Sequence, residues 1–148
     1  MQSRFTLDWI LVEELAIGPA PRKARHLDTL RSEGIKGILS LCHESEVTKL
    51  EDMNKQFFCK RTVLPDHKSG RMPKLGELKN ALKILKEMKE VGPIFVHCVA
   101  AMERSPLVCM AWLVKEKGLS MDEALDYMMQ IHPGTNPLPG QLELIKLI

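Results

Sequence analysis

The chain has 148 residues, of which 45% are hydrophobic and 27% are charged, and its 21 basic and 19 acidic residues give a net charge of +2. This length suffices for one packed core and is short for two, so we expect a single domain over residues 1–148. Because the charges nearly balance, the composition predicts no strong attraction to nucleic acid or to an anionic membrane.

The first 18 residues mix charged side chains among apolar ones, a pattern typical of neither a signal peptide nor a membrane span. We therefore expect a cytoplasmic protein whose cysteines stay reduced. The four cysteines form no Cys-x-x-Cys pair, and the two that adjoin histidines have the wrong spacing for one tetrahedral metal ion. We expect no metal, no cofactor and a monomeric chain.

Short β-leaning runs alternate with helical ones. In the first half of the chain, the patterns predict strands at Arg4–Ile10 and Leu15–Ile17, a helix at Ala24–Glu33, a strand at Ile35–Leu41, a helix at Glu44–Gln56 and a strand at Phe57–Leu64. In the second half they predict a helix at Lys74–Val91, a strand at Ile94–His97 and a helix at Ser105–Lys117. A further helix runs from the Ser120 capping box to about His132, and a last helical stretch follows Gly140. This alternation predicts an α/β fold with a central, mostly parallel sheet flanked by helices on both faces. In such sheets the ligand site lies beyond the carboxyl ends of the strands.

The loop after the strand at Ile94–His97 carries Cys98 and Arg104 with five residues between them. A loop wrapped against a helix N-terminus directs backbone N–H groups into one concavity, which suits an anion. The same partial positive charge favours the thiolate of Cys98, and the planar guanidinium of Arg104 can bind two phosphate oxygens. The loop therefore predicts a phosphoryl-transfer site that binds phosphate-like anions. A buried structural cysteine beside a surface arginine is the alternative.

A thiolate that attacks a phosphate ester needs an acid for the leaving oxygen and then a base for water, and one carboxyl can serve both steps. Asp66 is the candidate, because it follows a predicted strand and the chain then returns through a helix to the sheet edge that carries the cysteine. An ordinary turn residue is the alternative. We interpret the neighbouring His67, Lys68 and Arg71 as an exposed basic loop.

The pattern of Asp66 followed by His97-Cys98-x5-Arg104-Ser105 resembles the cysteine-based protein tyrosine phosphatases, and the chain is similar to their compact dual-specificity branch. The resemblance implies that phosphorylated proteins or peptides lose phosphate from phosphotyrosine, and also from phosphoserine or phosphothreonine, through a phosphocysteine intermediate. It implies that Cys98 is the nucleophile, Arg104 binds phosphate and Asp66 is general acid, then base. It also implies that Ser105 hydrogen-bonds the thiolate and that His97 supports the loop.

The residues between the cysteine and the arginine are the expected substrate-binding positions: Val99, Ala100, Ala101, Met102 and Glu103. Family members usually carry glycine where this chain has Ala101, and alanine is strained there if φ is positive. Glu103 would oppose a second phosphate, so the sequence favours phosphotyrosine over phosphoinositides. A solvated Glu103 paired with a nearby base is the alternative.

Cys42 follows the strand at Ile35–Leu41. If that strand is a parallel neighbour of the strand before Cys98, both sulfurs emerge at one sheet edge and could form a reversible disulfide. A buried, inert thiol is the alternative for Cys42. Three other functions stay open for the whole site: a phosphate-binding module with little turnover, a sulfurtransferase, and a phosphoinositide or RNA phosphatase.

Overall fold

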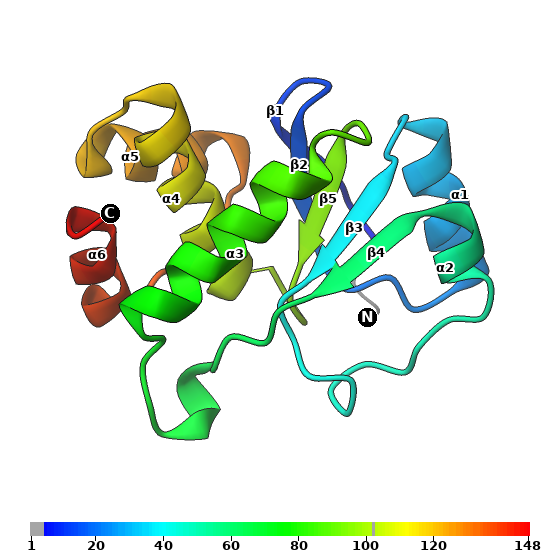
Figure 1. Ribbon diagram of the computed structural model, residues 1–148, viewed down its shortest axis with the longest axis horizontal. Coiled ribbons are helices and arrows are strands. Elements are labelled where there is room, and N and C mark those ends of the chain that lie inside the picture. Colours follow the sequence, from blue (N-terminus) through cyan, green and yellow to red (C-terminus); the bar gives the residue numbers. More distant parts are fainter. Residues whose placement is uncertain (1–4, 102) are drawn as a thin grey trace.

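A computed structural model describes residues 5–101 and 103–148 and contains one five-stranded sheet with the spatial order β1-β2-β5-β3-β4 (Figure 1). The antiparallel pair is β1–β2, and the other neighbouring strands are parallel. The strands are β1 (Asp8–Leu11), β2 (Leu15–Gly18), β3 (Gly37–Ser40), β4 (Phe58–Arg61) and β5 (Ile94–His97). The predicted α/β fold with a mostly parallel sheet is confirmed.

Helices cover both faces of this sheet, as predicted. They are α1 (Ala24–Ser32), α2 (Met53–Gln56), α3 (Leu75–Met88), α4 (Arg104–Lys117), α5 (Met121–Ile131) and α6 (Pro139–Lys146), with a short 3-10 helix, η1 (His67–Ser69). Figure 1 shows α1 and α2 on one side of the strands and α3 to α6 on the other. The predicted capping box at the start of α5 is present, because the Ser120 hydroxyl accepts a hydrogen bond from the Glu123 amide.

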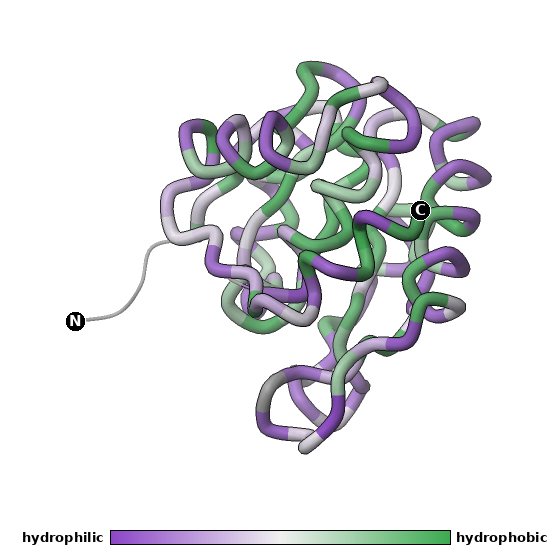
Figure 2. Tube along the Cα trace, turned by 90° about the vertical axis from the view of Figure 1, so that its left-hand side faces the viewer, coloured by the Kyte–Doolittle hydropathy of each residue, from purple (hydrophilic) through white to green (hydrophobic). Residues whose placement is uncertain are grey.

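Each face of the sheet has its own hydrophobic core. On the side of α1, Leu27 and Leu30 pack with Phe95 of the central strand β5. On the other side, the buried apolar residues of α3 pack against helix α4. The first ten residues of α4 are all buried. Figure 2 shows hydrophobic segments running through the interior and hydrophilic segments on the outer turns of the helices. Burial on both faces explains why β2, β3 and β5 are nearly continuous apolar runs.

The helix predicted at Glu44–Gln56 is wrong for most of its length, because only Met53–Gln56 is helical. Asp52 has a φ of 66°, in the left-handed region, so a regular helix cannot run through it. The Glu46 carboxylate accepts a hydrogen bond from the backbone N–H of His43 at 2.7 Å and does not lie along a helix face. The apolar spacing that suggested a helix therefore belongs to a loop after β3.

Other differences concern the ends of elements. The strand predicted at Phe57–Leu64 stops at Arg61. The helix predicted at Lys74–Val91 stops at Met88, four residues before Gly92, which has a positive φ. The first predicted strand begins at Asp8, and its predicted start at Arg4 lies outside the described residues. No helix in the described part of the chain is long and apolar enough to cross a membrane.

The topology brings three loops to one edge of the sheet. Strands β3 and β5 are parallel neighbours with Ser40 opposite His97, so the segments that follow them begin at the same edge. Strand β4 is parallel to β3 and ends there too, which leads the chain towards Asp66. Helix α4 starts at this edge with its N-terminus next to the loop after β5. The ends of the parallel strands therefore define the place where a ligand site is expected.

Candidate active site

The loop between β5 and α4 forms the floor of a cleft with a volume of about 850 Å³. Cys98 and Arg104 flank this loop and are 3% and 4% exposed, respectively. The cleft is lined by Glu46, Asp66, Lys68, Ser69, Cys98, Val99, Ala100, Glu103, Arg104, Asn136 and Leu138. The structure thus brings together the predicted nucleophile and phosphate ligand, from the loop between β5 and α4, and the predicted acid, from the segment before η1.

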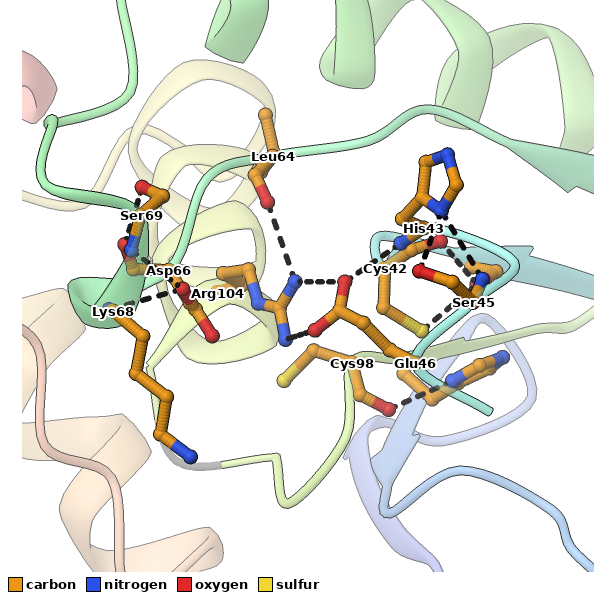
Figure 3. Close-up of polar contacts among 12 residues, drawn as sticks. Cys42, His43, Ser45, Glu46, Leu64, Asp66, Lys68, Ser69, Cys98 and Arg104 are labelled. Atoms are coloured by element: carbon orange, nitrogen blue, oxygen red, sulfur yellow. Dashed lines mark hydrogen bonds and ion pairs between the residues drawn. The ribbon is translucent and has the colours of Figure 1, made fainter. Parts of the chain in front are cut away.

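Arg104 is held by a two-pronged ion pair with Glu46. Its Nη2 lies 3.0 Å from Oε1 of Glu46 and its Nη1 lies 3.1 Å from Oε2, while Nη1 also donates to the carbonyl of Leu64 at 3.3 Å. Figure 3 shows these contacts beside the Cys98 thiol. The hydrogen bonds from Arg104 lower the pKa of Glu46 despite its partial burial. Glu46 therefore fixes the orientation of the guanidinium fork, a role the sequence analysis missed.

Asp66 caps the 3-10 helix η1 beside the cleft. Its Oδ1 accepts hydrogen bonds from the backbone N–H groups of Lys68 at 3.0 Å and Ser69 at 3.1 Å. The Ser69 hydroxyl donates to the Asp66 carbonyl at 2.7 Å, which closes the turn. These contacts hold the carboxyl group at the cleft wall. The turn expected under the alternative reading of Asp66 is therefore present, and its role as general acid and base stays a prediction.

His97 and Ser105 are buried on either side of the loop. The Nδ1–H of His97 donates to the carbonyl of Cys98 at 2.9 Å, so this side chain ties the last strand residue to the loop. Burial lowers the pKa of His97 to about 4, which keeps the ring neutral at physiological pH. The Ser105 hydroxyl is fully buried and has no hydrogen-bond partner within the described part of the chain. The hydrogen bond predicted from Ser105 to the Cys98 sulfur is therefore not formed among the described residues.

Ala101 has a φ of 60°, so the strained alternative for this residue holds. The side chain is fully buried, whereas Val99 and Ala100 face the cleft. The carbonyl of Val99 accepts the Ala20 N–H at 3.1 Å, which ties the loop to the segment after β2. Met102, which was also predicted as a substrate-binding position, lies outside the described residues.

Glu103 lies at the cleft wall, where its Oε1 accepts a hydrogen bond from the Nε2 of Gln141 at 2.8 Å. Gln141 is fully buried on α6 and its Oε1 accepts the backbone N–H of Leu138. A polar chain therefore links the loop to the segment before α6, which also brings Asn136 to the cleft. These contributions were not predicted, because the sequence pattern assigned no role to the connection before the last helix.

Cys42 is fully buried after β3 and is a free thiol, with its Sγ 3.4 Å from the Ser40 hydroxyl. The condition for the redox hypothesis is met, since β3 and β5 are parallel neighbours, but a disulfide with Cys98 stays a prediction. Across residues 5–101 and 103–148, the side chains of histidine, cysteine and acidic residues form no cluster of three that could hold a metal ion.

Comparison with known proteins identifies the class of this chain. The model of the dual specificity phosphatase catalytic domain matches residues 17–147. The chain therefore belongs to the dual specificity phosphatase family, whose members are cysteine-dependent phosphatases, and the predicted family and enzyme class are confirmed.

Two relatives show the range of this family. Dual specificity protein phosphatase 5 from Homo sapiens is 44% identical over 46 residues, which cover 31% of this chain and 12% of that protein. Phosphatidylglycerophosphatase and protein-tyrosine phosphatase 1 from Rattus norvegicus is 22% identical over 145 residues, which cover 94% of this chain and 75% of that protein. The chain thus matches about an eighth of the first relative and three quarters of the second.

Solved structures share the same fold. A mutant form of Tk-PTP, in which a glycine is replaced by alanine, superposes with a TM-score of 0.81 and 25% identity, covering 96% of this chain and 93% of that one. The structure of PTPMT1 in complex with PI(5)P superposes with a TM-score of 0.76 and 21% identity, covering 90% and 88% of the two chains. At this identity the second likeness supports the fold alone.

Proposed function

We propose that this chain is a protein phosphatase that hydrolyses phosphotyrosine, and also phosphoserine or phosphothreonine, through a phosphocysteine intermediate on Cys98. The observation that carries the proposal is the convergence of Cys98, Arg104 and Asp66 on one cleft. A buried thiol at the floor, an oriented guanidinium and a carboxyl at the wall are the three groups that the reaction needs. A sulfurtransferase would have no use for the carboxyl.

In the first step the Cys98 thiolate attacks phosphorus, so that an S–P bond forms as the bond from phosphorus to the leaving oxygen breaks. Asp66 gives its proton to that oxygen. The guanidinium of Arg104 and the backbone N–H groups of the loop stabilise the equatorial phosphate oxygens. In the second step Asp66, now a carboxylate, takes a proton from water, which attacks phosphorus while the S–P bond breaks and the thiolate leaves.

Depth and charge of the cleft favour a phosphorylated tyrosine. Cys98 is 3% exposed, so a substrate must bring its phosphate to a buried residue, and we expect the long aryl group of tyrosine to do so best. Glu103 sits at the wall with its carboxylate held by Gln141, where it opposes a second phosphate group. Because a relative is named a phosphatidylglycerophosphatase, a lipid phosphate monoester is the competing substrate.

The test is hydrolysis of a small aryl phosphate without added metal. Wild type should turn over, Cys98→Ser should be inactive and Asp66→Asn should be slower by about 10²- to 10⁴-fold, the usual size of general acid–base catalysis. Cys59→Ser is the matched control, since this thiol lies on β4 away from the cleft lining and should leave turnover unchanged. Undiminished turnover by Cys98→Ser would contradict the proposed nucleophile. If the wild type is inactive but still binds vanadate, the chain is a phosphate-binding module and not a phosphatase.

A panel of substrates tests the specificity. Phosphotyrosine peptides should have the highest kcat/KM, with phosphoserine and phosphothreonine peptides lower, and phosphatidylglycerophosphate and phosphoinositide vesicles lower still. A higher kcat/KM for a lipid substrate than for every peptide would contradict the proposed preference while leaving the chemistry intact.

A further inference from the structure

A buried histidine at the end of α5 contacts the strained residue of the phosphate-binding loop. The Nε2 of His132 lies 2.6 Å from the carbonyl oxygen of Ala101. Its Nδ1 lies 2.5 Å from Oδ2 of Asp8, at the start of β1. The side chain is 9% exposed, and it makes no hydrogen bond to Cys98 or Arg104. His132 therefore links the edge strand to the loop through one side chain.

Both neighbours of this ring accept hydrogen bonds. A backbone carbonyl has no hydrogen to give, and an ionised carboxylate has none either. A neutral imidazole carries one N–H and one bare lone pair, so it satisfies one of these two acceptors and faces the other with a lone pair. The imidazolium donates at both nitrogens and satisfies both. The geometry at His132 is therefore that of the charged form, paired with the Asp8 carboxylate.

The loop needs such a tether at Ala101. A φ of 60° is costly for a residue with a Cβ atom, and it persists when the surroundings hold the backbone in place. A left-handed residue in a loop also turns successive backbone N–H groups into one concavity, which is how an anion-binding nest is made. The contact from His132 holds the carbonyl of this residue and so opposes relaxation of the peptide out of the binding conformation.

We propose, resting on the phosphatase function proposed above, that charged His132, held by Asp8, is a positioning residue that clamps Ala101 and keeps the loop shaped for phosphate. Because histidine changes charge between about pH 5 and 8, the loop then binds oxyanions more tightly at the acidic end of this range. Loss of the ring proton removes one of the two hydrogen bonds and leaves a lone pair facing an acceptor.

Other ionisable groups on the elements packed against α5 do not account for this effect. On β1 the group is Asp8 itself. The buried part of α4 carries Arg104, which Glu46 pairs, and Cys109, whose thiol pKa is raised by burial. On α6 the exposed Glu143 and Lys146 pair with each other at 3.2 Å.

The experiment measures sulfate binding by calorimetry from about pH 5.5 to 8, since the charge of sulfate is constant over this range. All proteins carry Cys98→Ser, so ionisation of the thiol does not contribute. The parent should lose affinity by about tenfold as pH rises, the size expected for one charge-assisted hydrogen bond. His132→Gln should bind weakly at every pH, and His132→Arg, a permanent cation, should remove the fall in affinity.

Two further variants separate positioning from a merely structural role. Asp8→Asn should weaken sulfate binding at the acidic end of the range and so flatten the profile, because the carboxylate that holds the ring against Ala101 is gone. His26→Gln, at a half-buried histidine on α1, should keep the pH profile of the parent. Asp8→Asn also keeps the proposal testable if the arginine variant does not fold.

The outcomes are distinct for the two proposals. A parent that binds sulfate with a flat pH profile, or an Asp8→Asn protein with the profile of the parent, would overturn the role of His132 and leave the phosphatase proposal standing. A parent that binds no sulfate at any pH would contradict the phosphate site itself, and the tether with it.

Discussion

Replacing Glu46 with glutamine should damage the site without touching any atom that reacts. Glu46 makes two hydrogen bonds to Arg104, and the Arg104 side chain is 5% exposed while that of Glu46 is 28% exposed. Glutamine keeps one oxygen to accept a hydrogen bond but turns an amide N–H₂ towards the other donor. The variant therefore loses a charge-assisted bond and leaves the fork of Arg104 without its two-sided partner.

The structure sets the size of this effect. A hydrogen bond to a charged group contributes about 1.5–3 kcal/mol, and a tenfold change in rate corresponds to about 1.4 kcal/mol. The kcat/KM for an aryl phosphate should therefore fall by about 10- to 100-fold. Because Arg104 lowers the pKa of Glu46, the pair stabilises the fold above the unfolded pKa of glutamate, and this contribution is lost as pH falls through the lower folded value.

Steady-state kinetics with a matched control test this prediction. Glu44→Gln removes the same charge two residues away, from a carboxylate that is 77% exposed and 3.9 Å from Arg61. That surface pair contributes little, so Glu44→Gln should change kcat/KM by less than about twofold. Equal kcat/KM values for Glu46→Gln and Glu44→Gln would refute the positioning of Arg104 by Glu46.

Three further predictions concern stability. Because the pKa of His97 is lowered to about 4, folding stability should fall by about 3 kcal/mol as pH drops from 6.5 towards 4, and denaturant unfolding should show a smaller fall in His97→Asn. Ala101→Gly should change the free energy of unfolding by less than about 1 kcal/mol. Relief of about 1–2 kcal/mol of backbone strain is offset by the greater flexibility of glycine in the unfolded chain and by loss of a buried methyl group. A fall in the free energy of unfolding of more than about 3 kcal/mol would contradict the strain. Gly18→Ala should destabilise by about 1–3 kcal/mol or more, because the new Cβ would lie 2.3 Å from the Thr6 carbonyl oxygen, whereas Gly76→Ala meets nothing within 4 Å and should leave the thermal midpoint unchanged or raised.

Features encoded within one segment could be predicted from the sequence. The leucine spacing of α3 and the capping box of α5 are local patterns, and the structure contains both helices. The loop from Cys98 to Arg104 is also a single segment between a buried strand and a helix, so its chemistry was visible in the sequence. Parallel pairing then placed Asp66 at the same edge.

Contacts between distant segments could not be predicted in this way. Glu46 and Arg104 are 58 residues apart, and Asp8 and His132 are 124 residues apart. No local periodicity links such pairs, and the apolar spacing around Glu46 favoured a helix instead of the loop that carries it. The available signal was the position of the segment after a parallel strand. It was used for Cys42, which closely follows β3, but not for Glu46, which lies six residues beyond the end of β3.

The central claim is that phosphate passes through Cys98, and trapping the intermediate tests it most directly. Ser105→Ala should slow its breakdown, because the orphaned hydroxyl at the start of α4 would no longer assist the leaving thiolate. After rapid mixing with a phosphotyrosine peptide and quenching, mass spectrometry of the digested protein should find one phosphate on the peptide that contains Cys98. If wild type hydrolyses the substrate and neither protein carries phosphate on that peptide at any time, the account is contradicted.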